Sequence, residues 1–216
     1  MAQLKRMGIL ERKEKQKLEI RKMILEAAMQ LFMQEGFENV SIRKIADLIE
    51  YSPTTVYLYF KDKNEIFYHL HESGFAKMIE YNANLATISN PLIRLYKMGE
   101  NYIQFGLEYP QFYDIMFIQK EPMQSLMQQL GEECTQWSLG DNALSQLKAI
   151  LIECMEKNLI KKGPIDSVAL AIWGMVHGLV SLYIRDRLTP LVAKDAAIVV
   201  MHNSLNWMIQ TLDNSH

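Results

Sequence analysis

The sequence predicts an all-α fold of about nine or ten helices, and three observations support this prediction. Apolar residues recur at spacings of three and four along the chain, and no stretch shows the alternation expected of a half-buried β-strand. Capping residues and prolines divide the chain into segments of helical length with short connections. The composition, with 49% hydrophobic and 22% charged residues among 216, is that of an ordinary folded protein and excludes disorder and a disulfide-dense scaffold.

The first three predicted helices lie in the N-terminal quarter of the chain. An apolar stripe over residues 20–32 indicates a helix that ends near Gly36. Ser41 is placed to cap a short second helix, because its hydroxyl can accept a hydrogen bond from a free backbone N–H. Ser52 caps a third, and Pro53 follows at the first helical position, where a missing N–H costs nothing.

Longer helices are predicted for the rest of the chain. Asp62 opens the first of them, and Glu65 stands three residues later, as in a capping box. Asn-Pro, Glu-Pro and Gly-Asp pairs mark the next helix starts, and a Lys-Lys-Gly-Pro break and a Thr-Pro pair separate the last two. The predicted helices are about 62–86, 91–109, 122–137, 141–160, 165–187 and 191–211.

Charge is distributed unevenly, although the formal net charge is only −2. Residues 1–63 carry 12 Lys and Arg against 9 Asp and Glu, whereas the remainder carries 11 against 16. A basic N-terminal segment in a chain that is otherwise acidic indicates that this segment binds nucleic acid. The basic cluster between Lys5 and Lys22 is interleaved with glutamates, so it is explained equally by a solvated helix face and by DNA contact.

The sequence shows no arrangement typical of a metal site, a cofactor site or a secreted protein. Cys134 and Cys154 belong to no Cys/His cluster, so we expect buried thiols, no metal and no cofactor. The charged N-terminus has no apolar signal segment. The apolar run 168–184 is shorter than the about twenty residues of a membrane span, which favours a core or subunit interface in a cytoplasmic protein.

Residues 41–63, SIRKIADLIEYSPTTVYLYFKDK, form the pattern of a helix-turn-helix, two short helices around a tight turn after a longer one. Small residues at the start of the second short helix would let it enter a DNA major groove about 12 Å wide. Its hydroxyls and free N–H groups can bond bases or phosphates. We expect a core of Ile45, Ala46, Ile49, Tyr51, Val56 and Phe60, and outward-facing Arg43, Lys44, Tyr57, Tyr59 and Lys63.

This pattern resembles the TetR/AcrR family of bacterial transcriptional regulators. The matching residues are Ser41, Ile45 and Ala46, followed by Ser52, Thr55, Val56, Tyr57, Tyr59, Phe60 and Lys63. The resemblance implies a homodimer, with a DNA-binding domain at residues 1–64 and a ligand-binding and dimerisation domain at residues 65–216. Glu50 stands where the family usually has glycine, and we therefore expect a different turn conformation there.

The resemblance also implies the residues that contact DNA. Thr54 and Thr55 match the start of the recognition helix, and Tyr57 and Tyr59 match aromatic residues that contact bases or backbone, although Tyr59 fits the core equally well. The full set implied is Ser41, Arg43, Ser52, Thr54, Thr55, Tyr57, Tyr59 and Lys63.

Methionine and aromatic residues are frequent in the C-terminal part, where they fit either a core or the lining of an apolar cavity. In the family this region holds the effector, so the expected ligand contacts are Tyr102, Phe105, Phe112, Met116, Trp137 and His177. The segment Trp173–Gly178 resembles a Trp/His-Gly signature of one subgroup, although His177 also fits a core histidine. Gly174, Gly178 and Ser181, with the apolar face of 191–211, predict a dimer interface through the last two helices.

These observations predict a ligand-responsive DNA-binding regulator. We expect a repressor that binds a palindromic operator as a homodimer and is released by a small, mostly apolar effector. An activator fits the sequence equally well. A helical interaction protein and an enzyme on the same fold are the alternatives, but we find no catalytic arrangement or phosphate loop to support an enzyme.

Overall fold

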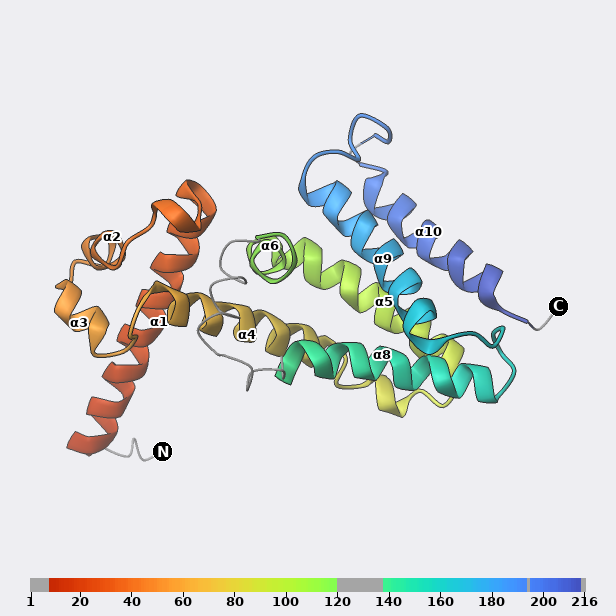
Figure 1. Ribbon diagram of the computed structural model, residues 1–216, viewed down its shortest axis with the longest axis horizontal. Coiled ribbons are helices and arrows are strands. Elements are labelled where there is room, and N and C mark those ends of the chain that lie inside the picture. Colours follow the sequence, from red (N-terminus) through yellow and green to blue (C-terminus); the bar gives the residue numbers. More distant parts are fainter. Residues whose placement is uncertain (1–7, 120–137, 194, 215–216) are drawn as a thin grey trace, which may run out of the picture. The chain divides into compact units, whose positions relative to one another are not determined.

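The computed structural model describes residues 8–119, 138–193 and 195–214 (Figure 1). Over these residues the chain forms nine α-helices and two short 3₁₀ helices, with no β-strand beyond a single bridge between Ile160 and Asp213. The all-α prediction is confirmed. The chain divides into two compact units within one helix, between His71 and Glu72.

The first unit is a helix-turn-helix supported by a long helix. Helix α1 (Ile9–Glu35) ends at Gly36, as predicted, and the 3₁₀ helix η1 (Phe37–Asn39) follows. Helix α2 (Ile42–Leu48) packs on α1, and α3 (Pro53–Tyr57) packs on α2 (Figure 1). The predicted caps are confirmed, because Ser41 Oγ accepts from the Lys44 N–H at 3.3 Å and Ser52 Oγ accepts from the Thr55 N–H at 3.1 Å.

A small aromatic and aliphatic core holds the first unit together. The rings of Phe32, Phe37 and Phe67 lie 5.2–6.1 Å apart, centroid to centroid, in tilted and edge-on contacts. The expected core residues Ile45, Ala46, Ile49, Val56 and Phe60 are all buried. The same expectation for Tyr51 is wrong, since 38% of this residue is exposed.

Helix α4 (Lys63–Tyr81) runs from the first unit into the second. Asp62 caps it by accepting hydrogen bonds from the N–H groups of Asn64 and Glu65, both at 2.9 Å. The Glu65 carboxylate accepts from the Lys61 N–H, one residue before the cap, so the capping box is displaced by one position. The helix ends at Tyr81 rather than near residue 86, because the chain turns there and enters the 3₁₀ helix η2 (Leu85–Thr87).

The second unit is a bundle arranged around a central helix. Helix α5 (Pro91–Glu108) packs against α6, α8, α9 and α10 (Figure 1). The surrounding helices are α6 (Pro110–Phe117), α8 (Ser138–Glu156), α9 (Ile165–Ile184) and α10 (Ala197–Leu212). Helix α6 was not predicted, and the helix expected at 122–137 lies outside the described residues.

Two of the predicted helix boundaries in this unit are several residues off. Helix α8 ends at Glu156 rather than near 160, and Asn158, at φ 54°, turns the chain away in a left-handed conformation. Helix α10 begins at Ala197 rather than 191, because residues 188–192 and 195–196 form turns and bends. Apolar periodicity continues through both turns, which is why the sequence alone extended the helices.

Glycines let the helices of this bundle approach closely. A Cβ atom on Gly106 of α5 would lie 2.3 Å from Val180 Cγ1 of α9. A Cβ atom on Gly99 would lie 2.6 Å from the end of the Leu205 side chain of α10. The two glycines therefore set the distance between α5 and its neighbours.

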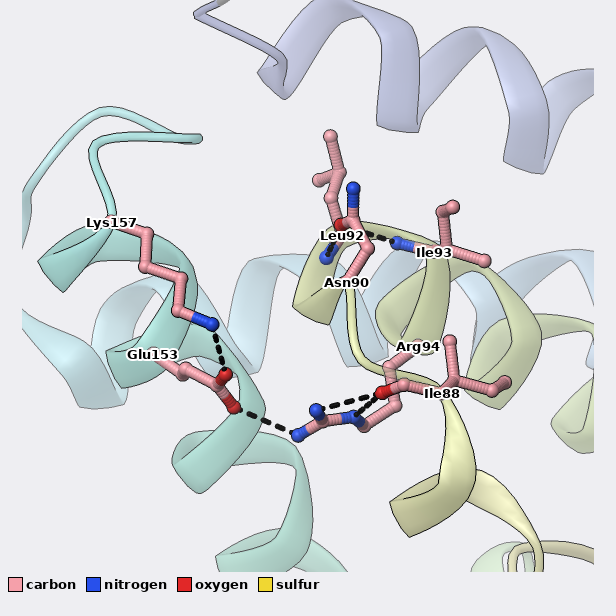
Figure 2. A network of polar contacts seen from close by, with 7 residues as sticks. All are labelled: Ile88, Asn90, Leu92, Ile93, Arg94, Glu153 and Lys157. Carbon is pink, nitrogen blue, oxygen red and sulfur yellow. Dashed lines mark hydrogen bonds and ion pairs between the residues drawn. The ribbon is translucent and has the colours of Figure 1, made fainter.

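An ion-pair network joins the start of α5 to the end of α8 (Figure 2). The Arg94 guanidinium donates to Glu153 Oε2 at 2.8 Å and, through two further nitrogens, to the Ile88 carbonyl at 2.9 and 3.1 Å. Lys157 donates to the other Glu153 oxygen at 2.8 Å, and Asn90 caps α5 beside this cluster. The paired cations keep the pKa of the Glu153 carboxyl low.

Helix α9 is the most apolar element of the described chain. It has the length and apolar composition of a possible membrane span, contrary to the expectation that this run is too short, although such a single helix is weak evidence of a membrane protein. Much of its outer side is uncovered, including Leu170 at 61% and Leu182 at 41% exposed. The helix is therefore not buried on most sides within one chain.

Candidate functional site

The turn between α2 and α3 places the second short helix. Glu50 has φ 59°, so it adopts the left-handed conformation that glycine prefers. The N–H of Tyr51 bonds the Ala46 carbonyl at 3.0 Å, and the N–H of Glu50 bonds the Asp47 carbonyl at 3.2 Å. This is the hydrogen-bond pattern of a Schellman motif, with Glu50 in the position usually held by glycine. The expectation of a different turn conformation is wrong, since glutamate occupies the left-handed one.

Helix α3 presents an exposed face to solvent. Thr54, Tyr57 and Leu58 stand at spacings of three and four and are all exposed, with Leu58 at 77% and Tyr57 at 57%. Tyr59 is half-buried. Leu58 was not among the predicted site residues. Its exposure could not be predicted from the sequence, because it lies within the run of apolar and aromatic residues 56–60.

The hydroxyl groups at the start of α2 and α3 are already engaged in capping. Ser52 Oγ lies 2.9 Å from Thr55 Oγ1 as well as accepting from the Thr55 N–H. A capping hydroxyl keeps its proton and a lone pair for a further partner. Ser41 can therefore still donate a hydrogen bond to a phosphate, as can one of the pair Ser52 and Thr55, whose other hydroxyl proton is shared between them. Thr54 has an exposed side chain.

The three predicted cationic residues of this unit differ in their surroundings. Arg43 is exposed. Lys44 forms an ion pair with Glu35 at 2.5 Å and donates to the Asn39 carbonyl at 3.0 Å. Lys63 donates to the Phe37 carbonyl at 2.9 Å and lies 4.3 Å from the centre of the Phe37 ring. The Lys63 ammonium thus anchors η1 to α4, which leaves part of its donor capacity for another group.

A cavity of about 230 Å³ lies inside the second unit. Its lining is almost wholly apolar, with aromatic rings from α4, α5, α6 and α9. The polar side chains among the described lining residues are Asn82, Tyr102, Asp141 and the indole of Trp173, and none of them is a lysine or arginine. The principal lining residues are Phe75, Met78, Leu95, Met98, Tyr102, Phe117, Leu147, Ile172, Trp173, Val176, Leu205 and Met208.

A hydrogen-bonded network of aromatic side chains closes one wall of this cavity. The Trp173 Nε1–H donates to the Tyr102 hydroxyl at 3.2 Å, and the Tyr102 hydroxyl donates to that of Tyr113 at 3.4 Å. Tyr113 Oη lies 2.6 Å from His177 Nδ1, and the two rings are stacked. Burial lowers the pKa of His177 and raises those of Tyr102 and Tyr113, so all three groups are neutral near pH 7.

The structure places the predicted ligand residues in different surroundings. Tyr102 lines the cavity, and His177 reaches it through the hydrogen-bonded network. Phe105 and Met116 are buried, and Phe112 is half-buried, but none of the three belongs to the lining. Trp137 lies outside the described residues. The sequence did not single out Phe75, and it placed Leu205 on the apolar face of 191–211 expected at a dimer interface, whereas Leu205 is buried and lines the cavity. Only the tertiary fold brings α4 and α10 to one cavity.

The histidines, cysteines and carboxylates of the described residues form no group of three that could hold a metal ion. Cys154 is fully buried in the core of the second unit, and burial raises the pKa of its thiol to about 11. The expectation of a buried thiol is confirmed for Cys154, and a thiol with a raised pKa carries little reactive thiolate near pH 7. Cys134 lies outside the described residues.

Comparison with known proteins gives consistent matches over both units. Residues 24–70 match the model of "Bacterial regulatory proteins, tetR family", and residues 95–211 match that of a "Tetracyclin repressor-like, C-terminal domain". No curated protein matches the chain.

Solved structures share its fold at low sequence identity. A bacterial regulatory protein in the tetR family from Rhodococcus RHA1 superposes with a TM-score of 0.70 at 16% identity, covering 91% of this chain and 98% of that one. The fatty acid degradation regulator FadR from Bacillus halodurans gives 0.68 at 15%, covering 86% and 93%. The TetR family transcriptional regulator PfmR from Thermus thermophilus gives 0.67 at 22%, covering 84% and 96%.

Proposed function

The chain belongs to the TetR family of bacterial regulatory proteins, and from this premise we propose that it is a repressor that binds a palindromic operator as a homodimer. Members of the family are DNA-binding transcriptional regulators, so the chain is a regulator and not an enzyme. We assign DNA binding to residues 1–64 and ligand binding and dimerisation to residues 65–216. A DNA-binding regulator acts in the cytoplasm of a bacterium.

The observation that carries the DNA-binding proposal is the exposed face of α3. Thr54 and Tyr57 project from a helix whose start is capped by Ser52. Because Pro53 has no N–H and the Thr55 and Val56 N–H groups bond Ser52, the Thr54 N–H is the backbone donor of this turn that is left for a phosphate. Exposed Arg43 supplies a cation on α2, the helix that packs against α3. Together with the predicted contacts of Ser41, Thr55, Tyr59 and Lys63, these residues would hold α3 in a major groove.

The outward side of α9 and α10 supports dimerisation through these helices. Added Cβ atoms on Gly174 and Gly178 would meet nothing within 4 Å, so neither glycine is needed for packing inside one chain. Glycine in a helix interior costs about 1 kcal/mol relative to alanine. A second chain packing closely against α9 would explain both glycines, and exposed Val199 and Trp207 of α10 extend the apolar surface.

The cavity supports an effector that is small and mostly apolar. Its lining is nearly all hydrocarbon and aromatic, so burial of an apolar molecule would supply most of the binding energy. One structural neighbour is named as a fatty acid degradation regulator, which is compatible with a largely apolar ligand. Release of the operator requires the effector to bind one conformation more tightly than the other.

Selection of operator fragments tests this function. Purified protein is incubated with genomic DNA fragments at low salt, and the bound fragments are sequenced. We expect an inverted repeat, with half-sites about one helical turn apart or slightly more. Recovery of fragments without a shared motif would contradict operator binding. A transcription assay on the recovered promoter then separates a repressor from an activator.

Two substitutions at Tyr57 test the orientation of α3. Tyr57→Ala should weaken operator binding by about 1–3 kcal/mol without changing the helical circular dichroism, because the residue is exposed in the free protein. Tyr57→Phe keeps the ring and removes the hydroxyl, so it separates a hydrogen bond to phosphate from ring packing. Unchanged affinity in both variants would refute the assignment of this residue.

A further inference from the structure

The cavity wall formed by Tyr102 and Trp173 limits which hydrogen bonds a ligand can make. The Tyr102 hydroxyl has one proton and two lone pairs. Its proton has an acceptor within the protein, the Tyr113 oxygen at 3.4 Å. His177 Nδ1, at 3.2 Å, is a second acceptor in the tautomer that carries its proton on Nε2. One lone pair is taken by the Trp173 Nε1–H at 3.2 Å. A single lone pair is left, so this wall offers an acceptor and not a donor to a ligand.

The other polar groups of the lining point to the same chemistry. Asp141, an exposed residue in the first turn of α8, contributes a carboxylate. The Asn82 carbonyl accepts from the Asn101 side chain at 3.1 Å, which leaves its N–H₂ group as one donor among the described lining residues. Among the described lining residues this amide donor is accompanied by no lysine or arginine, and one amide donor does not offset the cost of removing a carboxylate from water.

Aromatic rings provide the rest of the site. Phe117 lies at the centre of a group, with ring centroids 5.6 Å from Phe75, 6.0 Å from Tyr102 and 5.9 Å from Trp173. All four residues line the cavity. The negative faces of aromatic rings attract a cation, most strongly when it is desolvated.

We propose that the cavity binds a lipophilic amine, with its ammonium directed to Asp141 and Tyr102 and its apolar body among the aromatic rings. The proposal excludes a free carboxylic acid as the preferred ligand. A cavity of about 150 Å³ accommodates benzene, so a volume of 230 Å³ takes about nine heavy atoms, the size of a phenylalkyl group. The inference rests on the proposed function only in taking this cavity as the effector site.

Three probes that share one body test the choice of head group. We would titrate the full-length protein at pH 7 by calorimetry with 3-phenylpropylamine, 3-phenylpropanol and 3-phenylpropanoate, whose shared body has about nine carbon atoms. The amine is protonated at this pH, as a lysine would be. We expect the amine to bind about threefold to tenfold more tightly than the alcohol, and the carboxylate at least about tenfold more weakly than the alcohol.

Matched variants assign the effect to individual groups. Asp141→Asn should remove the preference for the amine over the alcohol, whereas Glu156→Gln at the far end of α8 should leave it unchanged. Tyr102→Phe should weaken both the amine and the alcohol by about fivefold, because it removes the acceptor. Tyr96→Phe, on the same helix but outside the described lining, is its control.

Several outcomes would overturn the inference. These are carboxylate binding as tight as that of the alcohol, an amine preference that persists in Asp141→Asn, and binding of none of the three probes. Operator binding measured on the same samples without a probe keeps this test separate from the proposed function. If the protein binds the amine but no operator, the ligand inference stands and the proposed regulatory function fails. If it binds an operator but does not prefer the amine, the regulatory function stands and the ligand inference fails.

Discussion

The substitution Gly106→Ala tests whether the close approach of α5 and α9 is a requirement of the fold. The new Cβ would lie 2.3 Å from Val180 Cγ1, whereas carbon atoms in contact are about 3.5–4.0 Å apart. Val180 is fully buried and β-branched, so its χ1 angle in a helix has one strongly preferred value. The side chain cannot turn aside, and the two helices must separate.

The expected loss of stability combines two opposing effects. Alanine gains about 1 kcal/mol over glycine in a helix interior. Overpacking of a core costs about 1–3 kcal/mol and sometimes more, and an overlap of this depth belongs at the upper end. We therefore expect Gly106→Ala to destabilise the protein by about 2 kcal/mol, or about 4–8 °C in Tm for a chain of this size.

Two further variants decide whether the overlap is the cause. Gly74→Ala brings a Cβ within 2.4 Å of Met116 Sδ, which is nearly the same distance. Methionine is flexible, so this variant should cost at least about 1 kcal/mol less than Gly106→Ala. Val180→Ala removes the opposing methyl groups, and in the double variant with Gly106→Ala we expect a favourable coupling of about 1 kcal/mol or more.

Urea unfolding followed by circular dichroism at fixed protein concentration provides the measurement. Equal stabilities of the Gly106→Ala and Gly74→Ala variants would refute the reasoning, because they would show that the stiffness of the neighbour does not matter. Additive effects of Gly106→Ala and Val180→Ala would refute it too. In either case the distance between α5 and α9 would not be limited by Gly106.

Three other predictions follow from particular backbone and side-chain environments. Glu50→Gly should raise the free energy of unfolding by about 1 kcal/mol, because glycine adopts the left-handed conformation of this position without strain. Glu50→Ala keeps a Cβ atom and should not raise it. Equal effects of the two substitutions would show that Glu50 is not strained. Gly174→Leu should leave the helix content unchanged and shift the dimer to monomers in sedimentation, since the site is open within one chain; a persistent dimer would place the interface elsewhere. Burial lowers the pKa of His71 to about 4, so the folded state stays neutral while the unfolded state takes up a proton near its ordinary pKa of 6.5. The neutral His71 therefore contributes its full share to the free energy of unfolding above about pH 6.5. On the order of 3 kcal/mol of this free energy is lost as the pH falls from 6.5 towards 4. His71→Gln should remove this pH dependence, which urea unfolding at a series of pH values measures.

Local signals in the sequence were reliable where one residue acts on its own backbone. Ser41 and Ser52 cap helices as predicted, and Asn90 and Pro91 begin α5. Such signals failed where apolar periodicity continued through a turn, as at the ends of α4 and α8 and before α10. At Glu50 a residue unsuited to the left-handed region adopts it because two backbone hydrogen bonds of the turn require it.

In the candidate site too, local sequence predicts some features and not others. The exposed Thr54 and Tyr57 could be predicted from the helix-turn-helix pattern, because spacing along one short helix decides which side chains share a face. The engagement of Lys63 with the Phe37 carbonyl could not, since the two residues are distant in the sequence.

The sequence by itself determined the helical class, the caps, the family and the face of α3, because each depends on residues a few positions apart. Only the tertiary structure decided which side chains line the cavity, and that Tyr102 and Trp173 join a network with Tyr113 and His177. The physical reason is that the hydroxyl of Tyr102 on α5 is held by groups on two other helices, Tyr113 on α6 and Trp173 and His177 on α9. What the cavity can offer a ligand is therefore set by how α5, α6 and α9 pack, and not by any one segment.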